Sequence, residues 1–114
     1  MNKTESARVA IYVRVACDCA AIAGQLEAIE ERLRDDGLHA DPELQFIDKG
    51  CSGVALERAA LRKLREVAAD GRVGRLYVAS PDRLSRRIGE LDLLMGEFQR
   101  CGVELRFVEQ PRGA

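Results

Sequence analysis

The sequence predicts an α/β domain in which a central, mainly parallel sheet of four or five strands carries helices on both faces. Runs of β-branched and apolar residues, typical of strands, alternate with segments in which apolar residues recur every three or four positions, as in helices. Four strands alternate with three helices in this way, and right-handed crossovers then require a mainly parallel sheet. A length of 114 residues is enough for one domain with a single packed core.

The N-terminal part of the chain predicts a disordered tail followed by a buried strand. Residues 1–7 are polar, so we expect them to be disordered. Residues 8–13 form a nearly continuous apolar, β-branched run, as expected of a strand that is buried on both faces. This run leads through Arg14 into a loop of small and polar residues at positions 17–21.

Three segments have the apolar spacing that predicts amphipathic helices. They are residues 22–36, about 56–70 and about 88–100, and each is followed by a glycine that suits a helix end. The residues expected to face the core are Ile22, Leu26, Ile29 and Leu33 in the first helix, Leu56, Ala60, Leu64 and Val67 in the second, and Ile88, Leu91, Leu94, Met95 and Phe98 in the third.

The other predicted strands are short and differ in character. Residues 44–47 form the second strand, which leads into a loop with two glycines at 50–53. Residues 74–79 form a third, buried strand. Residues 103–108 alternate between apolar and polar side chains, as expected of a half-exposed strand at the edge of the sheet.

Composition excludes several classes of protein. No apolar run approaches the roughly 20 residues of a membrane span, and no signal peptide is visible. A formal net charge of −1 gives no overall attraction to nucleic acid or anionic lipid, so any phosphate recognition must be local. Cys17 and Cys19 make a poor zinc motif, because the four cysteines form no CxxC pair and only one histidine accompanies them. We expect no metal, and reduced thiols in a cytoplasmic protein.

Charged side chains follow the predicted strands where the strands end. Arg14 follows the first strand, Asp48 follows the second, and residues 80–87 after the third hold three arginines and an aspartate. The carboxyl ends of parallel strands meet at one edge of the sheet, so these side chains should gather near the point where strand order reverses. Arginine grips phosphate in a planar, two-pronged way, which predicts a phosphate-handling site. Arg83 and Arg86 are three residues apart and should point the same way on one helical turn.

The motifs of common phosphate-binding proteins are missing. The sequence has no GxxxxGK[ST] and no GxGxxG, which argues against a P-loop and a dinucleotide site. A receiver domain would carry paired acids after the first strand, and a metal-dependent nuclease would cluster carboxylates without so many arginines. An arginine-rich site instead suits metal-free phosphoryl transfer, in which guanidinium groups stabilise the charge on the phosphoryl oxygens.

Four segments resemble the N-terminal catalytic domain of the serine recombinases, the family of resolvases, DNA invertases and large serine integrases. The segments are AIYVRV (10–15), FIDKGCSG (46–53), ERAAL (57–61) and DRLSR (82–86). They have the order and spacing of the family, and the likeness covers about residues 8–110. The residues at 97–104 resemble those of the large-recombinase branch more than those of the other branches. The resemblance implies a resolvase-like three-layer fold and no metal or nucleotide cofactor.

The resemblance also implies a mechanism. Such enzymes cut each DNA strand by attack of a serine hydroxyl, hold a 5′-phosphoserine link, rotate subunits within a tetramer and rejoin the strands. Arg14, Arg83 and Arg86 match the arginines around the scissile phosphate, and Arg58 matches a further active-site arginine. Asp48 and Asp82 match carboxylates that orient the arginines, and Gln25 matches a glutamine near the site.

Each of these assignments has a plain structural alternative. Asp48 could cap a loop, Gln25 could lie on a helix surface, and Arg58 could simply begin a helix. The arginines of residues 80–87 could be ordinary surface residues at a solvated helix start.

The chain departs from the family at the nucleophile. A serine is expected two residues after Arg14, and this sequence has Ala16 there. A methyl group offers neither a lone pair nor a proton, so no covalent phosphoryl intermediate can form at that position. Cys17 is adjacent but should point the other way at a strand exit. The alanine is either a deliberate replacement that traps an uncleaved state or the mark of a natural, cleavage-deficient relative, and we expect no cleavage by this chain.

The resemblance also implies partners. Family members continue with a long helix that carries dimer contacts and lies on DNA, and then with a DNA-binding domain. We therefore expect residues 8–114 to be a truncated catalytic domain, which by itself binds DNA weakly and is a monomer or a weak dimer. The full-length protein should form homodimers and tetramers on its recombination site. Two other hypotheses stay open: a non-catalytic, recombinase-like assembly module, and an unrelated doubly wound domain that binds a small phosphorylated ligand.

Overall fold

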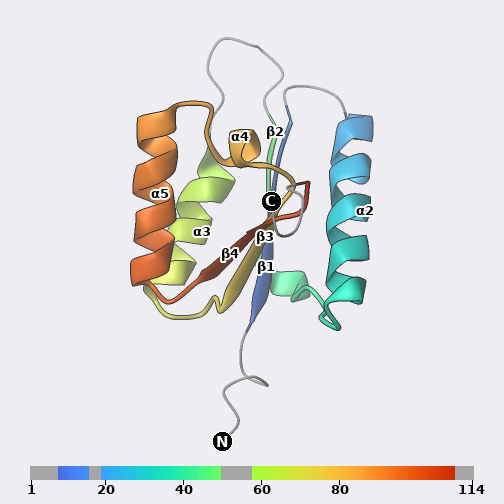
Figure 1. The fold of residues 1–114 in the computed structure, drawn as a ribbon, viewed down its shortest axis with the longest axis horizontal. Helices are drawn as coiled ribbons and strands as arrows, with labels where there is room; N and C mark the ends of the chain where they lie inside the picture. Colours follow the sequence, from blue (N-terminus) through green and yellow to red (C-terminus); the bar gives the residue numbers. More distant parts are fainter. Residues whose placement is uncertain (1–7, 16–18, 50–57, 110–114) are drawn as a thin grey trace, which may run out of the picture.

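A four-stranded sheet runs through the middle of the molecule, with its strands in the order β2-β1-β3-β4 (Figure 1). The computed structural model describes residues 8–15, 19–49 and 58–109. Every neighbouring pair of strands is parallel, which confirms the mainly parallel sheet expected from the sequence. The strands are β1 (Val9–Val15), β2 (Gln45–Lys49), β3 (Arg75–Val78) and β4 (Glu104–Phe107).

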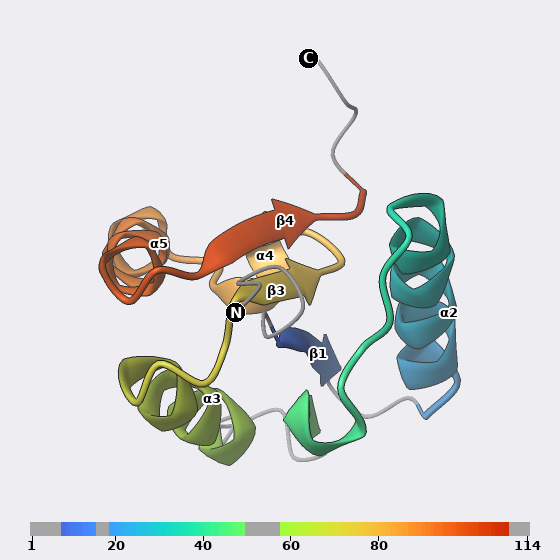
Figure 2. The same ribbon diagram turned by 90° about the horizontal axis from the view of Figure 1, so that it is seen from below.

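Helices cover both faces of the sheet, so the fold has three layers. α2 (Cys19–Asp35) lies against one face, and α3 (Ala59–Ala69) and α5 (Ile88–Arg100) lie against the other (Figures 1 and 2). The short 3-10 helix η1 (Pro42–Leu44) precedes β2, and the four-residue helix α4 (Pro81–Leu84) follows β3. Among the described residues, no helix is long and apolar enough to span a membrane.

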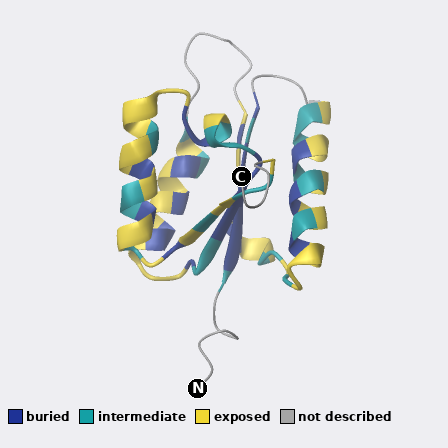
Figure 3. Cartoon of the chain, in the orientation of Figure 1, coloured by how far each residue is buried: buried dark blue, intermediate teal, exposed yellow. Residues whose placement is uncertain are grey.

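β1 is at the centre of the sheet and supplies side chains to both cores. Ala10 and Tyr12 pack into the core beneath α3 and α5, whereas Ile11 and Val13 pack against α2. This confirms the prediction of a strand buried on both faces, and Figure 3 shows the buried residues concentrated on the sheet and on the helix faces turned toward it. Arg14 is the only residue of β1 that is partly exposed.

Two predicted element boundaries are wrong. α2 begins at Cys19, and the segment 19–21 that was expected to be a loop is helical, because small residues such as alanine favour a helix. The second strand extends to Lys49, and Leu44 belongs to η1 instead, where its side chain is buried. The predicted start of the second helix, at residue 56, lies outside the described residues.

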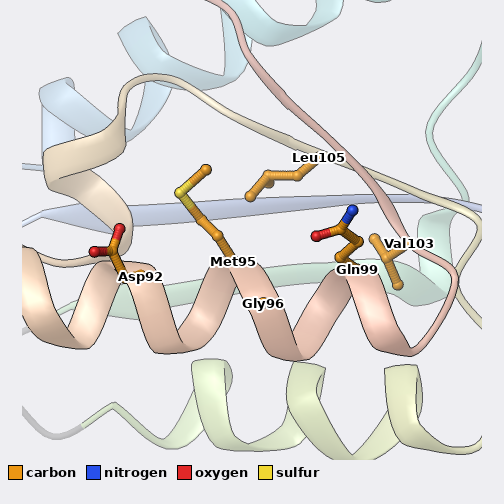
Figure 4. A pocket seen from close by; sticks show the side chains of 6 residues that line it. All are labelled: Asp92, Met95, Gly96, Gln99, Val103 and Leu105. Atoms are coloured by element: carbon orange, nitrogen blue, oxygen red, sulfur yellow. The ribbon is translucent and has the colours of Figure 1, made fainter.

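α5 has the predicted bounds, but part of the helix face that was expected to be buried is turned toward solvent. Leu94 and Phe98 are buried as predicted, whereas Ile88 is 78% exposed and Met95 is 39% exposed, so these two predictions are wrong. α5 lies over β4, the last strand of the described sheet. No further described strand therefore lies beneath the side of the helix that carries Ile88 and Met95. A hollow of about 500 Å³ opens there (Figure 4). It is lined by Asp92, Met95, Gly96, Gln99, Val103 and Leu105.

The ends of the helices and the edge of the sheet agree with the sequence. The glycines that follow the three long helices have φ angles of 72°, 76° and 81°, in the left-handed region that favours glycine at a helix end. They are Gly37, Gly71 and Gly102. β4 alternates between exposed and half-buried residues, as predicted for an edge strand.

Candidate active site at the carboxyl ends of the strands

The strand order places a candidate site at the carboxyl ends of β1 and β3. The chain passes from β1 to β2 on one side and later places β3 on the other side of β1, so the strand order reverses at β1. Ligands of parallel α/β sheets bind at such a point, outside the carboxyl ends of the strands. Arg14 lies at this end of β1, and α4 follows β3 at the same end of the sheet (Figure 1).

Arg14 and α4 hold each other in place. The Arg14 Nε donates to the Arg83 carbonyl at 2.9 Å, and its Nη2 donates to the Asp82 carbonyl. Arg83 donates back through its Nη1 to the Arg14 carbonyl, at 3.4 Å. The last carbonyls of a helix have no partner within the helix, so the guanidinium of Arg14 satisfies groups that α4 leaves open. The side chains of Arg14 and Arg83 are thereby fixed beside one another.

Three arginine side chains lie within electrostatic range of Arg14. Partial burial lowers the pKa of Arg14, and the positive charges of Arg58, Arg86 and Arg83 lower it further. Arginine nevertheless stays protonated in proteins, so the region carries several positive charges. We call these four residues the arginine group. Like charges repel at short range, so an anion placed among them is strongly attracted.

Arg86 does not share a helical turn with Arg83, and the prediction that it does is wrong. α4 ends at Leu84, and Ser85 is extended, with φ −165° and ψ 142°. The extended residue turns the chain away after one helical turn. Arg86 is exposed, and its charge still acts on Arg14 and on the carboxylate of Asp82.

Asp82 is an exposed carboxylate at the start of α4. Its Oδ1 accepts a hydrogen bond from the Ser80 hydroxyl at 2.6 Å. This bond, followed by the charges of Arg83 and Arg86, lowers the pKa of Asp82, which is therefore a carboxylate at neutral pH. Its direct link to Arg14 runs through its backbone carbonyl.

Asp48 is buried and caps α3. Its carboxylate accepts hydrogen bonds from the backbone N–H groups of Ala60 at 2.8 Å and Leu61 at 3.0 Å, in the first turn of that helix. It also accepts the hydroxyl of Tyr12 at 2.7 Å. Burial raises the pKa of Tyr12, and the bond to Asp48 raises it further, so Tyr12 stays neutral. Asp48 is paired with Arg14 across β1 and β2, which places this carboxylate beside the arginine group.

Arg58 connects the start of α3 to the segment between α4 and α5. It occupies the position before the first residue of α3, as in the helix-start alternative. Its Nη2 donates to the Leu84 carbonyl, and its Nη1 lies 3.3 Å from the Glu90 Oε1. The same Glu90 oxygen accepts the Ser85 hydroxyl at 2.5 Å. The backbone before α3 is thereby tied to the start of α5.

Gln25 is not a surface residue of α2. Its side chain is 7% exposed, and its Nε2 donates to the Arg14 carbonyl at 3.1 Å. Its Oε1 is buried and has no hydrogen-bond partner among the described residues. The surface alternative is therefore excluded, and Gln25 lies directly behind the arginine group.

Part of the predicted site lies outside the described residues. This applies to Ala16 and Cys17 and to the two-glycine loop at 50–53, while the side chain of Cys19 is also not described. The side chains on which the zinc alternative depends are among them. Val15, which immediately precedes Ala16, is buried at the end of β1.

Sequence reasoning missed three residues that hold the arginine group. They are Tyr12, Ser85 and Glu90. Two signals could have indicated them. Tyr12 is two residues before Arg14 in the strand and therefore on the same face of the sheet, and Ser85 lies inside the DRLSR segment. Glu90 had no such signal, because its partner Arg58 is 32 residues away in the chain.

Acid is expected to destabilise the domain through carboxylates at this site. The Ser80 hydroxyl lowers the pKa of Asp82, and the Ser85 hydroxyl, followed by Arg58, lowers that of Glu90. In the unfolded chain these carboxylates have their ordinary pKa of about 4 and therefore take up protons at a higher pH than in the folded chain. The free energy of unfolding therefore falls as the pH drops from about 4 through the lowered pKa values of the folded state. Thermal unfolding between pH 7 and pH 3 measures this. An Asp82→Asn, Glu90→Gln double variant should show a shallower fall, and equal slopes would contradict the assignment.

A comparison with known protein families identifies the domain. The family model described as "Resolvase, N terminal domain" matches residues 9–113, which is nearly the whole chain. The chain belongs to the serine recombinase family. A protein of Bacillus subtilis (strain 168) named "Putative DNA recombinase" is 36% identical over 102 residues. That match covers 88% of this chain and 20% of the relative, so the chain spans about one fifth of the relative's length.

Solved structures of serine recombinases have the same fold. A serine recombinase from Sulfolobus solfataricus is 26% identical, with a TM-score of 0.71, and the match covers 92% of this chain and 70% of that chain. The N-terminal catalytic domain of TP901-1 integrase is 24% identical, with a TM-score of 0.74, over 89% of this chain and 77% of that one. The family and the resolvase-like fold expected from four short segments are thus confirmed.

Proposed function

We propose that this chain is the catalytic domain of a site-specific DNA recombinase and that its arginine group holds the scissile phosphodiester. The observation that carries the proposal is the gathering of guanidinium groups from three distant segments at the carboxyl ends of β1 and β3. Phosphoryl transfer builds negative charge on the phosphoryl oxygens, and positive groups that are fixed in advance stabilise that charge. Arg14 and Arg83 are fixed in this way by their reciprocal bonds.

Arg86 differs from the other arginines in a way that suits a first contact with DNA. It is exposed, and no hydrogen bond or ion pair joins its side chain to another described residue. A guanidinium without a protein partner binds phosphate without first breaking an existing bond. We assign Arg86 to phosphate capture and Arg14, Arg58 and Arg83 to charge stabilisation. Asp48 supports them through Tyr12 and the start of α3, Asp82 through its backbone carbonyl, and Gln25 through its bond to the Arg14 carbonyl.

We further propose that Ala16 leaves this domain able to bind DNA but unable to cut it. The residue stands two positions after Arg14, where the reaction requires a hydroxyl nucleophile. Residues 8–114 would then act as one unit of a larger protein. Its partners would be a DNA recombination site and further copies of itself, in the cytoplasm. No metal ion is required by this mechanism.

Separate titrations with a DNA duplex and with ribose 5-phosphate test whether the site binds DNA. We expect a short DNA duplex at low salt to shift the arginine side-chain NMR signals of Arg83 and Arg86, and added salt to reverse the shifts. Ribose 5-phosphate should neither produce them nor raise the melting temperature. Arg86→Gln should weaken the response to DNA, whereas Arg65→Gln, which changes an arginine paired with Glu97, should preserve it. Stabilisation by ribose 5-phosphate with no response to DNA would support a small-ligand domain instead.

A further inference from the structure

Glu90, in the first turn of α5, contacts both the arginine group and the connection from α4 to α5. Its Oε1 receives the Ser85 hydroxyl at 2.5 Å and lies 3.3 Å from the Arg58 Nη1. Ser85 is 3% exposed, and its Oγ also accepts the backbone N–H of Arg87 at 3.1 Å. A buried hydroxyl that is itself held by the backbone therefore fixes the carboxylate. Glu90 is thus more firmly placed than an exposed glutamate in the first turn of a helix usually is.

Arg58 has few other anchors. Its Nη2 donates to the Leu84 carbonyl, its guanidinium lies within hydrogen-bond reach of the Tyr12 hydroxyl, and its Nε is buried without a hydrogen-bond partner among the described residues. Its positive charge also faces that of Arg14. A guanidinium in this position is pushed outward by its neighbours, and a nearby negative charge counteracts that force. Among the described residues, Glu90 is the only acidic side chain in ion-pair distance of Arg58.

We propose that Glu90 is a positioning residue, which keeps the Arg58 guanidinium turned inward beside Arg14. This inference rests on the proposed function, because it assigns Glu90 to the geometry of the same phosphate site. The alternative is an ordinary ion pair that merely links two helices. The chain contains such a pair for comparison: Arg65 of α3 and Glu97 of α5 lie 2.7 Å apart.

Side-chain NMR of Arg58 tests the inference without any need for catalysis. In the unchanged chain, the buried Nε–H of Arg58 should exchange slowly with water. We expect Glu90→Gln to speed that exchange by about tenfold or more, because the side chain then swings out. Glu97→Gln should leave Arg58 unaltered and change Arg65 only. Unchanged Arg58 exchange in Glu90→Gln, or equal effects of the two variants, would overturn the proposal.

A cleavage assay separates positioning from plain stability. In an Ala16→Ser background, Glu90→Gln should lower the rate of strand cleavage by about 10²-fold with little change in DNA affinity, since a small displacement of a catalytic group has that effect. Glu97→Gln should leave the rate within about twofold, and its melting temperature shows the cost of losing an ion pair between α3 and α5. Should the serine background cut no DNA, the proposed function fails while the NMR result still decides the role of Glu90.

Discussion

Replacing Ala16 by serine is expected to give a chain that becomes covalently attached to DNA. The serine supplies the hydroxyl that the methyl group lacks, and the arginine group stabilises the charge that develops as the hydroxyl attacks phosphorus. The hydroxyl oxygen forms a bond to the 5′-phosphate, and the deoxyribose 3′-oxygen leaves with a proton. The measurement is a protein–DNA band that resists denaturing detergent, after incubation with a pool of nicked duplexes of varied sequence. Sequencing the attached strands would also reveal the preferred site.

The arginine group provides the control for this experiment. The unchanged chain, with Ala16, should give no band, and an Ala16→Ser, Arg83→Gln double variant should lose about 10²–10³-fold of the adduct-forming rate, as expected when one charge-stabilising donor is removed. An Ala16→Ser, Arg65→Gln variant should react normally, because Arg65 lies in an ion pair outside the arginine group. If the serine variant forms no adduct on any DNA, the domain is better described as a non-catalytic assembly module.

Replacing Asp48 by alanine is expected to destabilise the domain more than any other single change at the site. The substitution removes three hydrogen bonds and leaves the Tyr12 hydroxyl and two N–H groups of α3 buried without their acceptor. Buried groups that lose a charged partner cost about 1.5–3 kcal/mol each, but such losses are not additive, so we expect about 3–4 kcal/mol in all. For a domain of this size, that lowers the melting temperature by about 10–15 °C.

Two variants distinguish the cap from a general loss of charge. Asp70→Ala removes an exposed carboxylate beyond the other end of α3 and should change the free energy of unfolding by less than about 0.5 kcal/mol. Tyr12→Phe removes the hydroxyl that donates to Asp48 and interacts with Arg58, but keeps the carboxylate at the start of α3, and should cost about 1 kcal/mol. Chemical unfolding of the three variants measures these differences. A small effect of Asp48→Ala would show that water or another group replaces the carboxylate at the start of α3.

Much of this fold can be read from the sequence, because burial leaves a local and repeated signal. The apolar run of β1 indicated a central strand, and the helical spacing of Ile29 and Leu33 indicated the face of α2 that packs on it. The alternation of strands and helices required a parallel sheet, which in turn brought the charged strand ends together. Arg14 and Arg83 come from opposite halves of the chain, yet topology alone predicted that they lie close together.

Other features depend on contacts that no local pattern contains. Spacing alone could not show that α4 stops at Leu84, because the helix ends where Ser85 becomes extended and bonds to Glu90. Spacing also failed for Ile88, since its exposure depends on which strands lie beneath α5.

The sequence by itself determined the family, the order of the elements and the gathering of charged residues at the carboxyl ends of the strands. Only the tertiary structure decided what holds those residues still. The physical reason is range: side-chain periodicity reports the environment of a single element, whereas a hydrogen bond such as that between Tyr12 and Asp48 requires two elements at a fixed separation. Such separations are set by the packing of the whole core.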